Sequence, residues 1–386
     1  MALEDQIREL EEEYARTEKN KKTEIHRGKL RAKIAMLREL VEKRASKGGG
    51  AGQGYAFKKS GSATVAMVGF PSVGKSTIMN RITNVFSEIG AYDFTTLTVV
   101  PGVLEYSGAK IQILDLPGII KGAAHGKGRG REVLSVIRSA DLIMFVCDPF
   151  NSHTIDVLLK ELYEVGMRVN THKPNVVVRK TNMGGIDIRP TVKLTKLDEE
   201  MIKEILREYG YVSAEIVLRE DIDVEQLIDV LDGNRLYVNG FVVVNKIDAA
   251  DPVMIERARG LLKNWKTAFV SGDKQIGLEE LKKTIYEMLN FVRVYLKPQG
   301  EEADMKVPMV VRSGTTVEGI CNMLHKDFVK NFRYALIWGK SARFPGQTVG
   351  KGHVLADKDV LTIMIKKSAG LLSDTSKSQT FTKIEK

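Results

Sequence analysis

The apolar and polar positions of this chain change period several times along its length. From about residue 62, short apolar runs alternate with longer amphipathic stretches. The apolar runs predict strands near 64–69, 98–106, 110–115, 141–147 and 241–246. The amphipathic stretches predict helices near 74–82, 130–139, 153–166, 253–264 and 277–290. This alternation is typical of an α/β fold, in which helices cover both faces of a mostly parallel sheet.

The first 46 residues follow a helical period instead. One predicted helix places Ile7, Leu10 and Tyr14 on a single face. A second helix has its own apolar face, formed by Leu30, Ile34, Leu37 and Val41. We expect an antiparallel helical hairpin with a charged outer surface that includes Lys29, Arg31 and Lys33. That surface either contacts RNA or only solvates the helix, and the pattern does not decide between them.

Changes in composition predict the domain boundaries. A Gly-rich segment at 47–54 reads as a linker, so residues 1–54 form the hairpin and its linker. Residues 55–290 form the α/β domain, which carries a predicted α+β insertion at 167–236. Within the insertion we expect strands at 175–180, 190–195 and 213–218 and helices at 198–209 and 223–231. The strands and one capped helix expected in 291–367 indicate a smaller β-rich domain. The Ser-, Thr- and Lys-rich tail, 368–386, is predicted to be disordered.

Composition and charge narrow the choice of partners and compartment. The formal net charge is +10 and the pI is about 9.3, which favours nucleic acid as a partner, although a basic protein without a polyanionic partner fits as well. The two cysteines, Cys147 and Cys321, make neither a disulfide framework nor a zinc site. We see neither a secretory signal nor an apolar run long enough to cross a bilayer. A cytoplasmic protein with no membrane partner is therefore expected.

One stretch carries the strongest chemical signal. It runs Gly69, Phe70, Pro71, Ser72, Val73, Gly74, Lys75, Ser76, Thr77, directly after the predicted strand and before a predicted helix. In that context the pattern predicts a phosphate-binding loop, because glycines let successive N–H groups turn inward at the start of a helix. Lys75 would supply a point charge for the outer phosphates, and the Ser76 hydroxyl would bind Mg²⁺.

Further polar residues follow the other predicted strands, where an open α/β sheet places its ligands. Asp115 follows the run Ile111–Leu114 and is expected to reach Mg²⁺. The N–H of Gly118 is expected to contact a terminal phosphate. A threonine after the first helix commonly completes the Mg²⁺ shell, and we assign that part to Thr96, with Thr95 as the alternative. The predicted metal ligands are therefore Ser76, Thr96 and Asp115.

The segment after the strand at 241–246 predicts which base is bound. Asn245, Lys246 and Asp248 are expected to read guanine, because the Asp248 carboxylate only accepts hydrogen bonds and suits N1–H and the exocyclic amine. Adenine presents an acceptor at N1, so an ATPase is disfavoured. The main-chain N–H groups of Ser271 and Gly272 are predicted to face the guanine carbonyl oxygen.

The catalytic group is not identified by the pattern. Many GTPases have Gln directly after the glycine at position 118, where it orients the attacking water, but this chain has Ile119. A side chain without donors or acceptors cannot do this, so slow intrinsic hydrolysis is expected unless a cation or a partner contributes. The Gly-rich segment that follows is predicted to act as a nucleotide-sensing switch.

Together these motifs resemble those of the developmentally regulated GTP-binding proteins, which belong to the Obg-related translation-factor GTPases. The resemblance covers residues 1 to about 367. It rests on the phosphate loop and on the segments Ala15–Lys21, Tyr92–Thr98, Val100–Val103, Asp115–Ile120, Gly126–Arg131 and Phe332–Gly339.

The resemblance implies GTP hydrolysis with Mg²⁺, association with the ribosome and its RNA, and a regulatory partner protein that binds the GTPase and C-terminal domains. It implies that residues 291–367 form a TGS domain of the β-grasp type, expected to have four strands and one helix, and that the insertion resembles a ribosomal-protein fold. It also implies stimulation by K⁺, although related potassium-using GTPases usually have Asn where this chain has Ser72. The alternative is an RNA- or ribosome-binding scaffold that GTP locks in one conformation with little hydrolysis.

Overall fold

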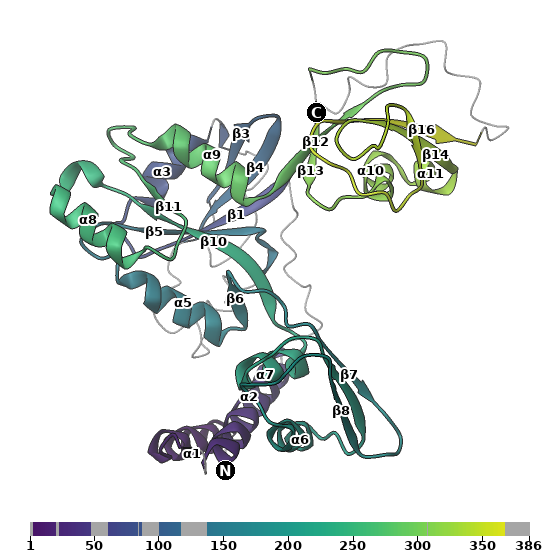
Figure 1. Ribbon diagram of the computed structural model, residues 1–386. Helices are drawn as coiled ribbons and strands as arrows, with labels where there is room; N and C mark the ends of the chain where they lie inside the picture. The colour runs from purple at the N-terminus through teal and green to yellow at the C-terminus, as the bar shows by residue number, and fades with distance from the viewer. Residues whose placement is uncertain are drawn as a thin grey trace. The chain divides into compact units, whose positions relative to one another are not determined.

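The computed structural model describes residues 3–20, 23–47, 61–83, 85–86, 100–116, 137–306 and 308–366 (Figure 1). The chain divides into two compact units. The first contains residues 1–58, 118–143 and 153–240, and the second contains residues 59–117, 144–152 and 241–386.

In the described part of the chain, an eight-stranded sheet forms the centre of the α/β fold and confirms the predicted class. Its strands follow the order β11-β10-β5-β1-β4-β3-β2, and β6 pairs with β10. The strands are β1 (Ala63–Val68), β2 (Val85–Phe86), β3 (Val100–Tyr106), β4 (Ala109–Asp115), β5 (Leu142–Cys147), β6 (Met167–Val169), β10 (Leu236–Val244) and β11 (Thr267–Phe269). The pairs β1–β4 and β10–β11 are parallel, whereas β3 runs antiparallel to β4.

The central strands are apolar on both faces because both faces are covered. All six residues of β1 and all six of β5 are buried, including Cys147. The associated helices are α3 (Lys75–Ile82), α5 (Thr154–Glu164), α8 (Pro252–Leu261) and α9 (Leu278–Met288), with a short 3₁₀ turn at Ile247–Ala249. Of the helix predicted at 130–139, the described part, 137–139, is helical. No helix among the described residues is long and apolar enough to cross a membrane.

The insertion forms a separate three-stranded sheet with two helices. Its elements are β7 (Val176–Lys180), β8 (Ile186–Pro190), α6 (Glu199–Glu208), β9 (Ala214–Leu218) and α7 (Val224–Asp232), and the sheet order is β7-β9-β8. Both helices, β7 and β9 lie where the sequence predicts them. The strand predicted at 190–195 is wrong, because β8 ends at Pro190. Ile186 and Ile188 supply its core-facing side chains, and Pro190 cannot donate within a ladder.

The N-terminal helices pack against this insertion. Helices α1 (Leu3–Arg16) and α2 (Glu24–Lys47) form the predicted pair, and Ala32 of α2 is fully buried in one hydrophobic core with residues of α6, β9 and α7. Lys29 and Arg31 form ion pairs with Glu204 and Glu225, respectively. These two cations therefore serve internal contacts, which corrects the expectation that they lie on a free outer surface. The sequence could not reveal this, because the partner carboxylates lie more than 150 residues away.

The C-terminal domain has five strands rather than the expected four, in the order β13-β12-β16-β14-β15. Its elements are β12 (Phe291–Leu296), β13 (Met309–Arg312), α10 (Val317–Leu324), α11 (Lys326–Lys330), β14 (Phe332–Trp338), β15 (Gln347–Val349) and β16 (Asp359–Ile365). The three residues of β15 are too few to give a strand period, and α11 is a second short helix. As predicted, Thr316 caps α10, since its hydroxyl accepts from the Gly319 N–H at 3.3 Å.

Candidate nucleotide-binding site

The loop between β1 and α3 has no room for a side chain at two of its glycines, and one of them also has a positive φ. Gly74 has φ 89°, and a Cβ there would lie 2.2 Å from the side-chain nitrogen of Asn245. A Cβ on Gly69 would lie 2.3 Å from the carbonyl oxygen of Val146. The backbone of this loop therefore lies directly against the ends of β5 and β10, and any larger residue at either position would displace it.

Lys75 begins α3 and turns back over this loop. Its Nζ donates to the carbonyl oxygens of Gly69 and Phe70, both at 3.0 Å. The side chain is nearly buried, and burial lowers the pKa of the ammonium, while the nearby Asp115 carboxylate opposes that shift. A positive charge is therefore held beside the loop carbonyls, on side-chain bonds that can be exchanged for bonds to an anion.

Ser76 and Asp115 meet next to the loop. The Ser76 hydroxyl donates to Oδ2 of Asp115 at 2.6 Å, which brings together the start of α3 and the end of β4. The other carboxylate oxygen, Oδ1, is buried and has no hydrogen-bond partner among the described residues. A buried acceptor without a partner is rare and marks a place for a water or an ion. A hydroxyl and a carboxylate oxygen are ligand types that Mg²⁺ accepts, so these residues fit a Mg²⁺ ion.

Asn245 joins three segments of the site. Its side-chain Nδ2 donates to the Val73 carbonyl oxygen at 2.9 Å, and its Oδ1 accepts from the Gly272 N–H at 3.0 Å. Its main-chain N–H donates to the Cys147 carbonyl oxygen at 2.9 Å. The side chain is 2 % exposed, and both of its polar atoms are engaged by the protein. Asn245 therefore holds these loops together.

Lys246 makes a second connection to the phosphate loop. Its Nζ donates to the Ser72 carbonyl oxygen at 2.6 Å. Both residues have positive φ, 61° at Lys246 and 63° at Ser72, although neither is glycine. Such a conformation is costly for residues with a Cβ and persists where surrounding contacts impose it. The bond between these two residues is one such contact.

Asp248 is the exposed carboxylate of this site, in the turn after β10. A hydrogen bond with the Ser271 side chain lowers the pKa of Asp248, so the carboxylate stays ionised at neutral pH and can only accept. Ser271 is fully buried, and its main chain pairs with Ile276. The turn after β11 therefore positions the Asp248 carboxylate.

Comparison with protein families identifies the domains of the chain. A family described as "50S ribosome-binding GTPase" matches residues 64–180, and one described as the C-terminal region of the MMR_HSR1 domain matches residues 183–291. A TGS domain family matches residues 292–365. The three matches cover the α/β sheet, most of the insertion and the C-terminal domain.

Similarity to curated proteins extends over nearly the whole chain. A GTP-binding protein of Methanocaldococcus jannaschii is 54% identical over 95% of this chain and 94% of its own length. Developmentally-regulated G-protein 2 of Arabidopsis thaliana is 44% identical over 95% of this chain and 92% of its own, and developmentally-regulated GTP-binding protein 1 of Xenopus laevis is 44% identical over 93% and 98%. The chain belongs to the developmentally regulated GTP-binding proteins. It thus carries a GTPase domain followed by a TGS domain, as the resemblance implied.

Several predicted site residues of this developmentally regulated GTP-binding protein lie outside the described residues. They are Gly118, the two alternatives Thr95 and Thr96, and Ile119, together with the predicted switch segment. All other predicted site residues gather at the carboxyl ends of β1, β4, β10 and β11.

The end of β5 is a part of this GTPase domain that the sequence reasoning missed. Val146 and Cys147 present carbonyl oxygens to Gly69 and Asn245, and the buried Asp148 accepts from the Phe150 and Asn151 N–H groups at 3.2 and 3.0 Å. The run Asp148-Pro149-Phe150-Asn151, directly after an apolar strand, is a turn signal that could have indicated this position.

Proposed function

We propose that the chain binds GTP and GDP at this site and hydrolyses GTP there. The observation that supports this most strongly is the convergence of the phosphate loop, Asp115 and the Asn245–Asp248 segment, connected by the side-chain bonds of Asn245 and Ser76. In this proposal residues 69–77 hold the phosphates, with Lys75 as the charge. Calorimetry with Mg²⁺ tests it: GDP and GTP should give heat and ATP none, and the reverse result would contradict the site.

Ser76, Asp115 and Thr96 would hold a Mg²⁺ ion in this site. The unpartnered Oδ1 of Asp115 and the Ser76 hydroxyl support the first two, and Thr96 is assigned from the motif alone. A bound Mg²⁺ would neutralise charge on the phosphates as GTP is cleaved. The protein's own contribution is to hold these oxygens beside Lys75 in a partly buried site.

Replacing Ser76 with Ala should weaken the effect of Mg²⁺ on nucleotide binding. Mg²⁺ should increase the GTP affinity of the unmodified protein. In Ser76→Ala this increase should be at least tenfold smaller, because one oxygen ligand is lost. Titration of GTP with and without Mg²⁺ measures this. Thr83→Ala is a matched control, since the Thr83 hydroxyl donates to Met79 O at the far end of the same helix. Equal Mg²⁺ dependence in both variants would exclude Ser76 as a ligand.

Base recognition is proposed to depend on Asp248, with Asn245 as a positioning residue. The ionised Asp248 carboxylate suits the N1–H and amine of guanine, and the Lys246 stem can lie along the base. The N–H groups of Ser271 and Gly272 would face the guanine carbonyl oxygen. The Ser271 N–H already donates to the Ile276 carbonyl oxygen, and the Gly272 N–H donates to Asn245 Oδ1. Either N–H would therefore have to share its hydrogen between two acceptors.

Hydrolysis by the isolated protein should be slow. Ile119 cannot orient the attacking water, so a cation such as K⁺ or a partner would have to supply that group. Single-turnover measurements with and without K⁺ check this expectation. Rapid cleavage by the protein alone in the absence of K⁺ would contradict it.

We further propose that the protein acts in the cytoplasm as a ribosome-associated factor in translation, together with a regulatory partner protein that binds the GTPase and TGS domains. The net charge of +10 and the ribosome-binding description of the matching family support this. The alternative is an RNA- or ribosome-binding scaffold that GTP locks in one conformation with little hydrolysis. Co-sedimentation of unmodified protein and Lys75→Ala with ribosomes separates them: loss of nucleotide-dependent binding in the variant favours the GTPase factor, and unchanged binding favours the scaffold.

A further inference from the structure

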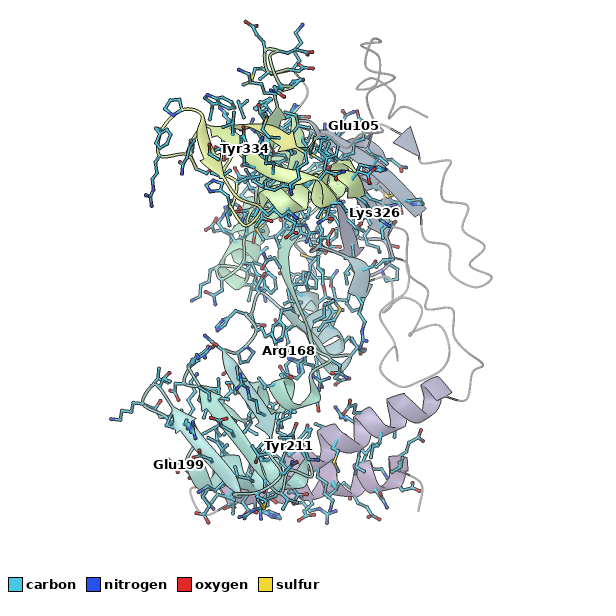
Figure 2. All side chains as sticks on the ribbon, turned by 90° about the vertical axis from the view of Figure 1, so that its right-hand side faces the viewer. Glu105, Arg168, Glu199, Tyr211, Lys326 and Tyr334 are labelled. Carbon is cyan, nitrogen blue, oxygen red and sulfur yellow. The ribbon has the colours of Figure 1, made fainter. Side chains whose placement is uncertain are left out.

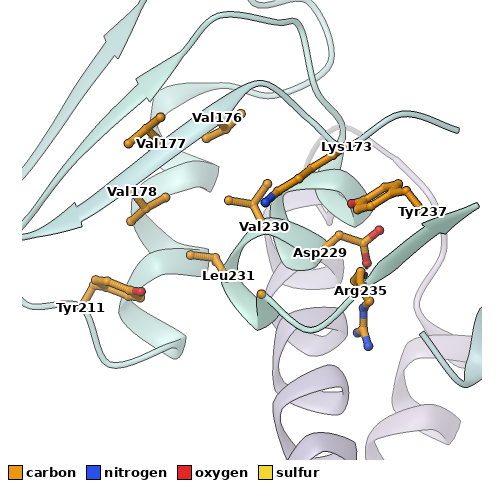
Figure 3. Close-up of a pocket in the computed structure, with 11 residues that line it drawn as sticks. Lys173, Val176, Val177, Val178, Tyr211, Asp229, Val230, Leu231, Arg235 and Tyr237 are labelled. Carbon is orange, nitrogen blue, oxygen red and sulfur yellow. Dashed lines mark hydrogen bonds and ion pairs between the residues drawn. The ribbon is translucent and has the colours of Figure 1, made fainter. Parts of the chain in front are cut away.

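The insertion contains a hollow of about 290 Å³ that the nucleotide site does not use. Val176, Val177 and Val178 of β7 line one side, and Val230 and Leu231 of α7 line the other, with Tyr211 at one end (Figure 3). Lys173 extends into the space between the strand and the helix (Figure 3). The β7 and α7 sides of the hollow are therefore aliphatic, and its lining also includes the polar side chains of Lys173, Asp229, Arg235 and Tyr237.

The strand beside the hollow is an edge strand with unused main-chain groups. Arg219 N–H donates to Asn175 O and Thr181 N–H donates to Ser213 O, so the odd-numbered residues between them face β9. The N–H and C=O of Val178 consequently point away from β9. Among the described residues they have no main-chain partner. An exposed row of such groups is a template on which another strand can pair.

The two edges of this small sheet differ. On β8, Arg189 forms ion pairs with Asp187 and Glu215, and the strand ends at Pro190. Charges and proline are the usual means by which proteins protect an edge. On β7 the first three residues are valines, and only Arg179 and Lys180 at its end are charged. The open edge is thus the one that adjoins the hollow.

The charges around the open edge define the partner. Lys173, Arg179 and Lys180 are exposed, and none forms an ion pair or a side-chain hydrogen bond with another described residue. The one carboxylate that lines the hollow, Asp229, is already paired with Arg168 and Arg235. The edge therefore presents uncompensated positive charge at both ends of an apolar strand.

We propose that β7 adds an extended acidic segment of a partner protein as a fourth strand, with an aliphatic side chain in the hollow and carboxylates facing Lys173 and the Arg179–Lys180 end. Main-chain bonds to Val178 would give this mode its affinity, and the hollow and the cations would give it selectivity. Single-stranded RNA would match the cations, but it has no use for the main-chain groups of Val178 or for a hollow lined by aliphatic side chains.

Selection of random nonapeptides displayed on phage, with the full chain as target, tests the proposal. Enriched peptides should alternate aliphatic residues with other types and carry Asp or Glu near their ends. Their affinities are then measured by fluorescence anisotropy. Val178→Pro should weaken binding at least tenfold, because it removes the outward N–H, and Lys173→Glu should weaken it roughly tenfold. Neither change removes a ladder hydrogen bond, so both variants should fold. Thermal melting followed by circular dichroism checks this.

Two matched variants serve as controls. Ile188→Pro removes an outward N–H on the opposite edge, and Lys193→Glu reverses an exposed charge elsewhere on the insertion. Both should bind the peptides within about twofold of the unmodified protein. The proposal is overturned if no peptide is enriched on the unmodified protein relative to a parallel selection on Val178→Pro. It is also overturned if the control variants weaken peptide binding as much as Val178→Pro and Lys173→Glu do. It is also overturned if oligouridylate displaces the peptides and itself binds Val178→Pro normally, since that result would indicate an RNA surface.

Discussion

Replacing Asp248 with Asn is expected to weaken GDP and GTP binding by about 100- to 1,000-fold and to create affinity for xanthine nucleotides. The reason is the number of acceptors. A carboxylate can accept from both N1–H and the exocyclic amine of guanine, whereas an amide accepts one bond and places its own NH₂ against the other donor. One charged hydrogen bond, which contributes about 1.5–3 kcal/mol, is lost, and the other weakens to the roughly 1 kcal/mol of a neutral bond. Xanthine has an oxygen in place of the amine and suits the amide.

Calorimetric titration of the variant with GDP and xanthosine diphosphate, at fixed Mg²⁺, measures both effects. Asp251→Asn is the matched control, because Asp251 is also an exposed aspartate just after β10 and its side chain makes no capping bond. GDP affinity should be unchanged in the control. Unchanged GDP affinity in Asp248→Asn would remove Asp248 from the base site.

The second large effect is expected in the insertion, where Asp229→Ala should destabilise the fold by about 3–5 kcal/mol. Asp229 of α7 accepts from Arg168 Nε at 2.6 Å, and Arg235 Nε donates to it at 3.0 Å. The side chains of Asp229 and Arg168 are 6 % and 8 % exposed. Arg168, which is labelled in Figure 2, also lies over the ring of Tyr163, 3.6 Å from its centroid. Removing the carboxylate leaves a buried guanidinium without its counter-charge, which costs far more than the pair contributes.

This cluster lies where the insertion leaves β6 and returns at β10, so its loss should loosen the base of the insertion first. Hydrogen–deuterium exchange of the peptide covering α7 measures this locally, which matters because a chain with several domains does not unfold in one step. Exchange should be about two to four powers of ten faster in Asp229→Ala. Asp187→Ala, which breaks the exposed pair with Arg189, should change it by less than tenfold. Similar rates in the two variants would show that burial of the pair has no energetic consequence.

Much of the fold follows from local signals in the sequence. Strands β1 and β5 are continuous apolar runs because both of their faces are covered, and the helices after them have clear amphipathic periods. Short or interrupted elements were harder to predict. The strand expected at 190–195 begins at Pro190, where β8 ends, and the three-residue β15 is set by pairing with β14 rather than by its own residues.

For the candidate site, the residues whose chemistry is fixed by type were predictable, and those whose role depends on a neighbour were not. Gly74, Lys75 and Ser76 form a contiguous motif with a strand before it and a helix after it. Asn245 belongs to a motif too, but only the structure shows that its side chain connects Val73 to Gly272. The carbonyl oxygens of Val146 and Cys147 have no side-chain signal of their own, and only the turn residues from Asp148 to Asn151 indicate where β5 ends.

The sequence by itself determined the order of the GTPase and TGS domains, the phosphate loop and the family, because each depends on residues close together in the chain. Only the tertiary structure decided that Lys29 and Arg31 serve internal ion pairs, that Asp229 is buried between two arginines, and that β7 is left as an open edge beside a hollow. These features depend on which distant segments meet, and one-dimensional periodicity does not specify that. They are set when the apolar faces of α2, α6, α7 and the small sheet are buried in one shared core.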